Sequence, residues 1–432
     1  MSALIIFIIT IILMISFIIF KPNINIKGFR IQTFWIIALI GALVMIISQN
    51  VNLNTLGTNL TNGKMNPIKI LTLFISLSML SISLDEQNFF NYLSVKALKK
   101  SNGSQYKIFF TIYFLVSILT IFTSNDIVIL TFTPFICLFS KKAKINPLPY
   151  LLVEFINANT YSMLLSIGNP TNIYLSSGFD ISFLDYVSKM WLPTLLSGVS
   201  TLLIILLLFK KELAKPIENI EIEDVQLKNK PLVIINLIIL GLTTIFLVIS
   251  NYISIEMWLI CLTSLIILTI VLLIVSIIKK DKKYILNTYG RLPYDLIPFI
   301  ISMFILVLAL KENGIITHIQ NILDKMSTNK FTTALSYGVS STLFDNIINN
   351  IPMSVLFTSV LEGKSEIALY ATIAGSNIGA YLTPVGALAG IMWMSILKNH
   401  DVKYSFLDFV KYGLILAPIS LLATIIGLFI LF

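Results

Sequence analysis

The sequence predicts an all-α polytopic membrane protein. We expect two inverted repeats, each with five transmembrane helices and one re-entrant hairpin, and with broken helices at the midplane. Three observations lead to this class. First, 56% of the 432 residues are hydrophobic and only 12% are charged, and apolar runs of 17 to 23 residues, long enough to span a bilayer, recur along the chain. Second, polar residues interrupt these runs at corresponding places in the two halves. Third, basic residues are concentrated in alternate loops.

The first repeat is expected over residues 1–209. Continuous apolar helices are predicted at 3–20, 32–48, 67–84 and 191–209. The first is interpreted as a helix rather than a removed signal peptide, because no basic segment precedes it and no small-residue cleavage pattern follows near Phe20. After Leu84, the stretch LDEQNFFNYLSVKALKK places apolar residues at helical spacing beside lysines, which is typical of a helix in the membrane interface.

Two polar interruptions define the rest of this repeat. Residues 107–140 are largely apolar except for Ser-Asn-Asp at 124–126. These residue types bond locally to the backbone, so they favour a re-entrant hairpin with a polar tip. The segment 150–173 begins as a helix and should break at SIGNPTN, where Pro170 lacks a backbone donor and Gly168 loosens the chain. A broken helix in hydrocarbon is tolerated only where it lines a cavity enclosed by protein.

The second repeat, 232–432, follows a charged linker at 210–231 and has the same order of elements. It is predicted to contain continuous helices at 232–250, 255–277, 294–310 and 405–432, an amphipathic piece at 311–330, a hairpin at about 331–360, and a helix at 366–397 broken at TPVG, 383–386. Short local matches pair Asn125 with Asn350, Asn159 with Asn377, and Gly168 with Gly386. Because five spans per repeat is an odd number, the second repeat should lie upside down relative to the first.

The distribution of basic residues supports this topology independently. Loops on one predicted side carry 21 of the 30 Lys and Arg residues, against six in loops on the other side and three at helix ends. By the positive-inside rule, the linker and the base of the first hairpin are expected to be cytoplasmic in a multi-pass protein of the cell membrane. The net charge of +9 is therefore interpreted as an orientation signal. Nucleic-acid binding is not expected, because it would need basic residues interleaved along one face.

The candidate binding residues are the polar groups expected at membrane depth. In the first repeat they are Ser124, Asn125, Asp126, Asn157, Asn159, Gly168, Asn169, Thr171 and Asn172. In the second repeat they are Asp345, Asn346, Asn349, Asn350, Ser376, Asn377, Thr383 and Gly386. Hairpin tips and half-helix N-termini offer free N–H groups to an oxyanion, whereas carbonyl, Asn and Ser oxygens suit a small cation. No Arg, Lys or His falls at these depths, so a strongly anionic substrate would need neutralising cations or helix ends.

Each acidic residue in these segments has two interpretations. Asp126 either binds the coupling ion, H⁺ or Na⁺, or caps the second hairpin arm. Asp345 is either a proton carrier or a buried, hydrogen-bonded structural acid. Glu154 is a further candidate for coupling. No cofactor and no metal cluster are expected, and a sodium ion near Asn125 and Asn350 is the alternative to a proton.

The remaining reactive residue types argue against an enzyme. Cys137 and Cys261 each lie inside an apolar run without paired spacing, which indicates buried packing rather than a disulfide or zinc site. His318 and His400 lie in predicted loops. A membrane-embedded enzyme would need a nucleophile, base or metal cluster at depth, and the scarcity of His and the separation of the two Cys residues argue against one.

Several of these motifs carry a resemblance to a known family. They are SND in the first hairpin, NNIP in the second, the NPTN break, LDEQNFFNYLSVKAL, and, most specifically, SNIGAYLTPVGALAGIMWMSILKNHDVKYSFLDFVKYGLILAPI. Through them the chain resembles the ion-transporter superfamily and, within it, the arsenite-efflux permease family, over nearly its whole length. The GNPTN turn is instead similar to the turns of the related sodium-coupled divalent-anion symporters.

The resemblance implies a proton-driven export of arsenite or antimonite, a homodimer, and optional partnership with a soluble ATPase. We therefore expect a secondary active transporter that moves a small oxyacid or anion across the lipid bilayer by alternating access. Sodium-coupled transport of a dicarboxylate or inorganic anion is the first alternative. A sodium/proton antiporter of the same superfamily is the second.

Overall fold

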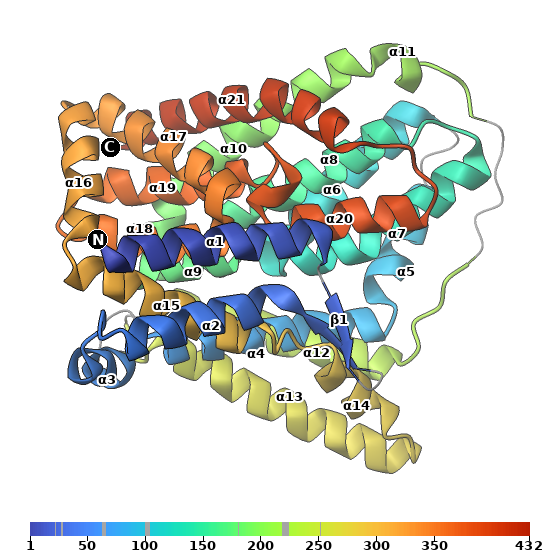
Figure 1. Ribbon diagram of the computed structural model, residues 1–432. Coiled ribbons are helices and arrows are strands. Elements are labelled where there is room, and N and C mark those ends of the chain that lie inside the picture. The colour runs from blue at the N-terminus through green and yellow to red at the C-terminus, as the bar shows by residue number, and fades with distance from the viewer. Residues whose placement is uncertain are drawn as a thin grey trace.

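The computed structural model describes residues 1–21, 23–26, 29–62, 66–99, 104–179, 181–217, 224–250 and 252–432 (Figure 1). The predicted all-helical class is confirmed. The exception is an antiparallel hairpin of β1 (Asn23–Ile26) and β2 (Phe29–Gln32), which connects the first two helices and was not predicted from the sequence. The strict alternation of polar and apolar residues in NINI and FRIQ is the signal that could have predicted it.

Up to the linker, the described residues of the first half form ten α-helices and one 3₁₀ turn. They are α1 (Ser2–Phe20), α2 (Thr33–Ile47), α3 (Leu53–Asn62), α4 (Pro67–Glu86), α5 (Phe89–Lys99), α6 (Gln105–Phe122), α7 (Asn125–Ala143), α8 (Leu148–Tyr161), the 3₁₀ turn η1 (Ser162–Leu164), α9 (Pro170–Ser177) and α10 (Phe183–Leu208). The linker contains the short helix α11 (Lys210–Leu213).

The second half repeats this order after the linker. Its helices are α12 (Lys230–Val248), α13 (Met257–Lys279), α14 (Lys283–Gly290), α15 (Leu296–Glu312), α16 (Ile315–Met326), α17 (Lys330–Ile348), α18 (Asn350–Val360), α19 (Glu366–Gly379), the 3₁₀ turn η2 (Pro384–Gly386), α20 (Leu388–Asn399) and α21 (Phe406–Leu431). Both broken helices and both hairpins therefore occur in the predicted segments.

Packing between the halves is reciprocal. Helix α2 packs on α15 while α4 packs on α13, α9 packs on α18 while α20 packs on α7, and α10 packs on α21. Figure 1 shows α2, α4, α12 and α13 on one side of the molecule and α8, α10, α19 and α21 on the other. Both chain termini lie at one end, near α16, and α11 and α14 lie at the other. Opposite orientation of the halves in a bilayer, and the boundaries 1–209, 210–231 and 232–432, stay predictions.

Both hairpins return to the side on which they start. The Tyr150 hydroxyl donates to Gln105 Oε1 over 2.8 Å, which holds the start of α8 beside the start of α6. Only residues 144–147 separate α8 from the end of α7, so the arms α6 and α7 share one base. In the second hairpin, Gln320 of α16 donates to the Val360 carbonyl oxygen over 3.0 Å, and α16 ends just before α17 begins.

The helices expose apolar surface as membrane-spanning helices do. Six of the described helices are long and apolar enough to cross a membrane, namely α4, α6, α10, α12, α13 and α21. The pair α15 and α16, bent by 77°, adds a seventh if it counts as one span. On α13 the exposed side chains include Ile266, Ile270 and Leu273, which suits a helix surrounded by lipid.

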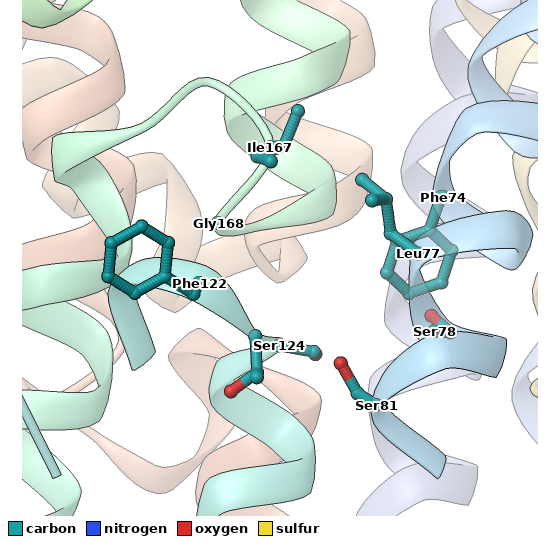
Figure 2. Close-up of a pocket in the computed structure, with 9 residues that line it drawn as sticks. Phe74, Leu77, Ser78, Ser81, Phe122, Ser124, Ile167 and Gly168 are labelled. Carbon is teal, nitrogen blue, oxygen red and sulfur yellow. The ribbon is translucent and has the colours of Figure 1, made fainter. Parts of the chain in front are cut away.

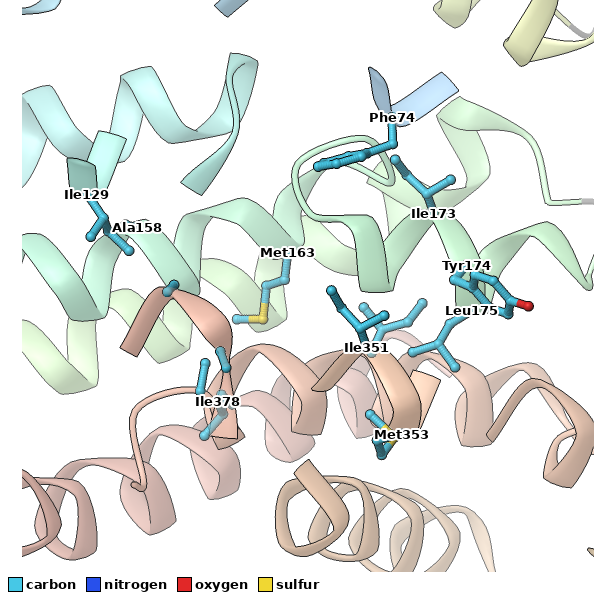
Figure 3. Packing of buried hydrophobic residues seen from close by; sticks show 14 of the residues in the cluster. Phe74, Ile129, Ala158, Met163, Ile173, Tyr174, Leu175, Ile351, Met353 and Ile378 are labelled. Atoms are coloured by element: carbon cyan, nitrogen blue, oxygen red, sulfur yellow. The ribbon is translucent and has the colours of Figure 1, made fainter. Parts of the chain in front are cut away.

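The interior between the two breaks is an apolar layer. Met163 of η1, Ile173 of α9, Ile351 of α18 and Ile378 of α19 are all buried in it (Figure 3). Ile173 and Ile351 come from the packed pair α9 and α18, one from each half. This layer fixes the position of the polar groups at the ends of the same helices.

A charge cluster ties α4 to the segment before α15. Arg291 donates to Asp85 Oδ2 over 2.6 Å and to Glu86 Oε1 over 2.7 Å. Thr131 of α7 donates to Asp85 Oδ1 over 2.9 Å. This bond connects the first hairpin to the charge cluster. Partial burial lowers the pKa of Arg291, but the hydrogen bonds and negative charges of Glu86 and Asp85 outweigh it and hold that pKa above its usual value. The guanidinium therefore stays charged and bridges both acids.

Candidate functional site

The two helix breaks are built from local sequence signals. In the first, Pro170 is the first residue of α9, and Asn169 Oδ1 caps that helix by accepting the Thr171 backbone N–H over 3.2 Å. In the second, Pro384 begins η2, and Thr383 Oγ1 accepts the Val385 backbone N–H over 3.3 Å. Proline suits the first helical position because its missing N–H would be unpaired there. The sequence thus stops each helix and restarts it a few residues later.

A glycine allows each break to fold tightly on the preceding helix. A Cβ at Gly168 would lie 2.2 Å from the Ser162 carbonyl oxygen, and a Cβ at Gly386 would lie 2.5 Å from the Gly379 carbonyl oxygen. Neither position tolerates a side chain without backbone movement. The two glycines, paired by sequence matching, therefore make the same close approach in the two halves.

Asn377 is the centre of a buried network that joins the halves. Its Oδ1 accepts from Ser162 Oγ over 2.9 Å and from Asn169 Nδ2 over 3.1 Å. Its Nδ2 donates to Asn172 Oδ1 over 2.7 Å, and Asn172 in turn donates to the Ser162 carbonyl oxygen over 2.9 Å. All four side chains are buried. The network fixes α19 against the first break.

The first hairpin tip extends this network. Asn125 Nδ2 donates to Asn159 Oδ1 over 3.2 Å, while Asn125 Oδ1 is buried without a donor among the described residues. Asn157 faces away, because its amide donates to the Tyr113 carbonyl oxygen and to Ser117 Oγ of α6 over 3.1 and 3.0 Å. Asn157 therefore does not join the Asn377 network, and its role in binding stays a prediction.

A small pocket opens beside the tip. Ser124 and Gly168 line it together with Ser78 and Ser81 of α4, and Figure 2 shows the Ser124 and Ser81 side chains on facing sides of it. The two α4 serines were missed from the sequence. They lie three residues apart and hence on one helix face, within the otherwise apolar run SLSMLSISL, which is the signal that could have found them.

Asp126 lies in the first turn of α7 and is half-buried. The residue that caps this helix is Ser124, and no side-chain cap is made there. Among the described residues, no hydrogen-bond donor or basic group contacts the Asp126 carboxyl. Asp126 therefore does not cap α7 in this structure.

The second hairpin tip is tied to the second break. Thr383 Oγ1 donates to Asn346 Oδ1 over 2.7 Å, and Asn346 Nδ2 donates to the Gly379 carbonyl oxygen over 3.1 Å. Asn349, which separates α17 from α18, has a φ of +73°, and its amide donates to the Val385 carbonyl oxygen over 2.9 Å. With a ψ of +153°, Asn349 lies outside the αL region, in a conformation that is essentially restricted to glycine, so its backbone is strained.

Several buried oxygens near this tip have no partner in the described part of the chain. They are both carboxyl oxygens of Asp345, the amide oxygens of Asn349 and Asn350, and the hydroxyl oxygen of Ser376. Asp345 packs against Gly379, where an added Cβ would lie 2.6 Å from Oδ2. An unpaired buried carboxylate is strongly destabilising, so this group must bind a proton or a cation.

The predicted residues thus form two clusters. The first contains Asn125, Asn159, Asn169, Asn172 and Asn377, with the capped Thr171 beside it, and the second contains Asp345, Asn346, Asn349, Thr383 and Gly386. Ser162 and Gly379, which sequence reasoning missed, hold the clusters together. Within the described residues, no three His, Cys, Asp or Glu side chains lie close enough to hold a metal ion.

A helical membrane protein with two broken helices, each joined by buried polar hydrogen bonds to the hairpin tip of its own half, has the architecture of a membrane transporter. The chain belongs to the CitMHS citrate transporter family, whose model matches residues 5–366.

Curated relatives and a solved structure agree with this class. The chain is 26% identical over 421 residues to a "putative arsenical pump membrane protein" of Bacillus subtilis, covering 91% of this chain and 93% of that protein. It is 24% identical over 371 residues to the "arsenical pump membrane protein" of Escherichia coli K12, covering 82% and 84%. The fold is similar to that of the YdaH transporter of Alcanivorax borkumensis, with a TM-score of 0.56 over 99% of this chain and 98% of that one, at 13% identity. The resemblance predicted from the motifs is confirmed.

Proposed function

We propose that this protein is a secondary active transporter that exports arsenite or antimonite by alternating access, driven by the proton gradient. The observation that carries the proposal is the buried network around Asn377, which is made of amides and hydroxyls from both halves. Arsenite near neutral pH is mainly an uncharged trihydroxy acid. Amide groups can donate to and accept from its hydroxyls without a compensating charge.

Charge supports this substrate over a multiply charged anion. No Lys, Arg or His side chain bonds to the two clusters within the described chain. Asp345 belongs to the second cluster, and Asp126 follows Asn125 of the first in the chain. These acids suit a carried proton. The arsenical pump relatives favour the same substrate class.

The second candidate is sodium-coupled transport of citrate or a related carboxylate, which the description of the matching family favours. In that case the unpartnered oxygens of Asp345, Asn349 and Asn350 would hold a sodium ion, and the cation would offset the substrate charge.

The cellular setting is part of the proposal. The excess of basic residues in alternate loops supports a cell-membrane location with the linker 210–231 on the cytoplasmic side. A homodimer, and optional association with a soluble ATPase, follow from the resemblance to the arsenite-efflux permeases.

Uptake into proteoliposomes tests the substrate and the coupling ion together. Arsenite is compared with succinate, citrate, sulfate and phosphate under imposed proton or sodium gradients. The proposal predicts arsenite uptake that depends on the proton gradient and is indifferent to sodium. Sodium-dependent uptake of citrate or succinate without arsenite transport would refute it in favour of the second candidate.

Single variants test the site. Asn125→Ala and Asn350→Ala should abolish transport while membrane abundance stays near normal, and Asn54→Ala, an exposed residue of α3, is the matched control. Loss of folded protein in the two hairpin variants would favour a packing role instead. Asp126→Asn should uncouple transport from the ion gradient, and an unchanged gradient dependence would exclude Asp126 from coupling.

A further inference from the structure

Glu154 is a buried acid that lies away from both hairpin tips. It is on α8, eight residues before the break at Ser162 and hence about 12 Å from it along the helix axis. Its side chain has no exposed surface. Thr133 of α7 donates to its two oxygens over 3.1 and 3.3 Å, and Trp393 of α20 donates to Oε2 over 3.2 Å. Three helices from both halves therefore meet on this carboxyl.

The bonding of Glu154 accommodates both protonation states. An ionised carboxylate in this position receives two neutral donors and no basic group from the described residues, which only partly offsets its desolvation. The Thr133 hydroxyl makes no other side-chain hydrogen bond in the described chain, so it can donate to the carboxylate or turn and accept from the neutral acid. Trp393 Nε1 can only donate, and its bond is stronger when Glu154 is charged.

A solvent-open pocket reaches the neighbourhood of this carboxyl. Cys137, one helical turn after Thr133 on α7, lines a pocket open to solvent together with Asn146, His400 and Lys403. The loops 141–149 and 398–404 form its mouth, and their basic residues place them on the predicted cytoplasmic side. Water in this pocket is thus separated from Glu154 by about one turn of α7.

The titratable and charged groups near Glu154 lie on the helices around α8 and at the mouth of the pocket. Cys137 faces it from α7, and Tyr404 packs on the Trp393 ring at 5.3 Å. Lys141, His400, Asp401 and Lys403 lie at the pocket mouth, with Lys141 and Asp401 3.6 Å apart. On α8 itself, Tyr150 lies one turn before Glu154 and donates to Gln105 Oε1. The helices packed against α8 also carry Tyr113 of α6, bonded to Tyr161, and Tyr186 of α10, which donates to the Met163 carbonyl oxygen. None of these tyrosines bonds to Glu154.

We propose that Glu154 is a third proton-binding site, which exchanges its proton with water of the pocket lined by Cys137 and His400. It is distinct from Asp126 and Asp345. In the step itself, a water from the pocket enters past Cys137 to the Thr133 side of the carboxyl. The O–H bond of the neutral acid then breaks, the proton passes to that water to give hydronium, and the carboxylate keeps the electron pair. The ionised group then holds Trp393 more tightly, which links the proton to the packing of α20 on α8. The role in transport rests on the proposed proton coupling, whereas proton exchange at Glu154 does not.

Infrared difference spectroscopy of the purified full chain in lipid tests the exchange without any substrate. Between acidic and alkaline buffer, we expect a carbonyl band of a protonated carboxylic acid that titrates and shifts in D₂O. Glu154→Gln should remove this band, while Asp126→Asn and Asp345→Asn keep it, and Thr133→Val should shift its frequency. Glu212→Gln, at a half-buried residue of the short linker helix α11, is the control. The proposal would be overturned if Glu154→Gln had the same carbonyl bands as the wild type. It would also be overturned if the band lost in Glu154→Gln did not change with pH or shift in D₂O.

Two transport modes distinguish this role from a structural one. In proteoliposomes that contain whichever substrate the wild-type protein carries, Glu154→Gln should lose at least tenfold in gradient-driven transport and keep its substrate exchange at equal pH. Equal loss of both modes would overturn the coupling role. If neither arsenite nor any substrate tested is carried, the proposed function fails, but the infrared result still decides whether Glu154 exchanges a proton.

Discussion

Gly168 offers the sharpest test of how the first break is built. In Gly168→Ala the new Cβ would lie 2.2 Å from the Ser162 carbonyl oxygen, whereas ordinary contact begins at 3.4 Å. The loop must therefore move by about 1.2 Å, the difference between these distances. Overpacking of this kind costs about 1–3 kcal/mol. The same carbonyl accepts from Asn172, and losing that bond adds about 1 kcal/mol.

The assay is thermal unfolding of the purified variants in one detergent or lipid, with transport measured in parallel. Gly241→Ala in α12 is the matched control, because nothing lies within 4 Å of its added Cβ. That substitution should be neutral or stabilise by up to about 1 kcal/mol through helix propensity. Gly386→Ala, 2.5 Å from the Gly379 carbonyl oxygen, should behave like Gly168→Ala. Equal unfolding midpoints for Gly168→Ala and Gly241→Ala would refute the close-approach argument.

The remaining predictions concern the polar groups. Asn377→Ala should destabilise the protein by about 1–3 kcal/mol for each buried partner left unpaired, seen as a lower unfolding midpoint, and an unchanged midpoint would contradict the network. Arg291→Ala should lower the free energy of unfolding by less than the roughly 3–5 kcal/mol lost when a fully buried pair is broken, because Arg291 is partly exposed. Added salt should reduce the difference in stability between this variant and the wild type. Equal stability of the two proteins at low salt would count against the cluster. Asp345→Asn should leave the unfolding midpoint equal or higher, because neither carboxyl oxygen has a donor, and should abolish gradient dependence of transport; a clear destabilisation would mean that Asp345 is a structural acid.

Local chemistry explains why so much of the fold could be predicted. Proline lacks an N–H and the Ser-Asn-Asp tip offers its own side chains to the backbone, so the break at Pro170 and the turn at Ser124 need no tertiary partner to define them. The apolar runs likewise predict the long helices, and the ends of most of these helices match the predicted ranges to within a few residues. The exception is α10, which begins at Phe183 rather than at residue 191.

Tertiary partners were harder to predict. Asn377 bonds with Ser162 and Asn169, which lie more than 200 residues away, and no local pattern specifies that register. The orientation of Asn157 could have been predicted from the sequence, because residues two apart on a helix do not share a face. Since Asn159 bonds to the hairpin tip, Asn157 must point elsewhere. Ser162 was missed because it acts through its position against Asn377 of the other half. Gly379 was missed because it acts through its close packing against Asp345 and Gly386 of its own half.

The proposed function requires the two hairpin tips and the two breaks to act together as one substrate site. Ligand-induced stabilisation of the purified protein measures this directly, since a ligand at 100 times its Kd adds about 2.7 kcal/mol to the folded state. Asn350→Ala is the informative variant, because its amide oxygen has no donor within the described chain and its removal should leave the fold intact. The account predicts that arsenite raises the unfolding midpoint of the wild type and of Asn54→Ala but not of Asn350→Ala. An equal rise in all three proteins would contradict it.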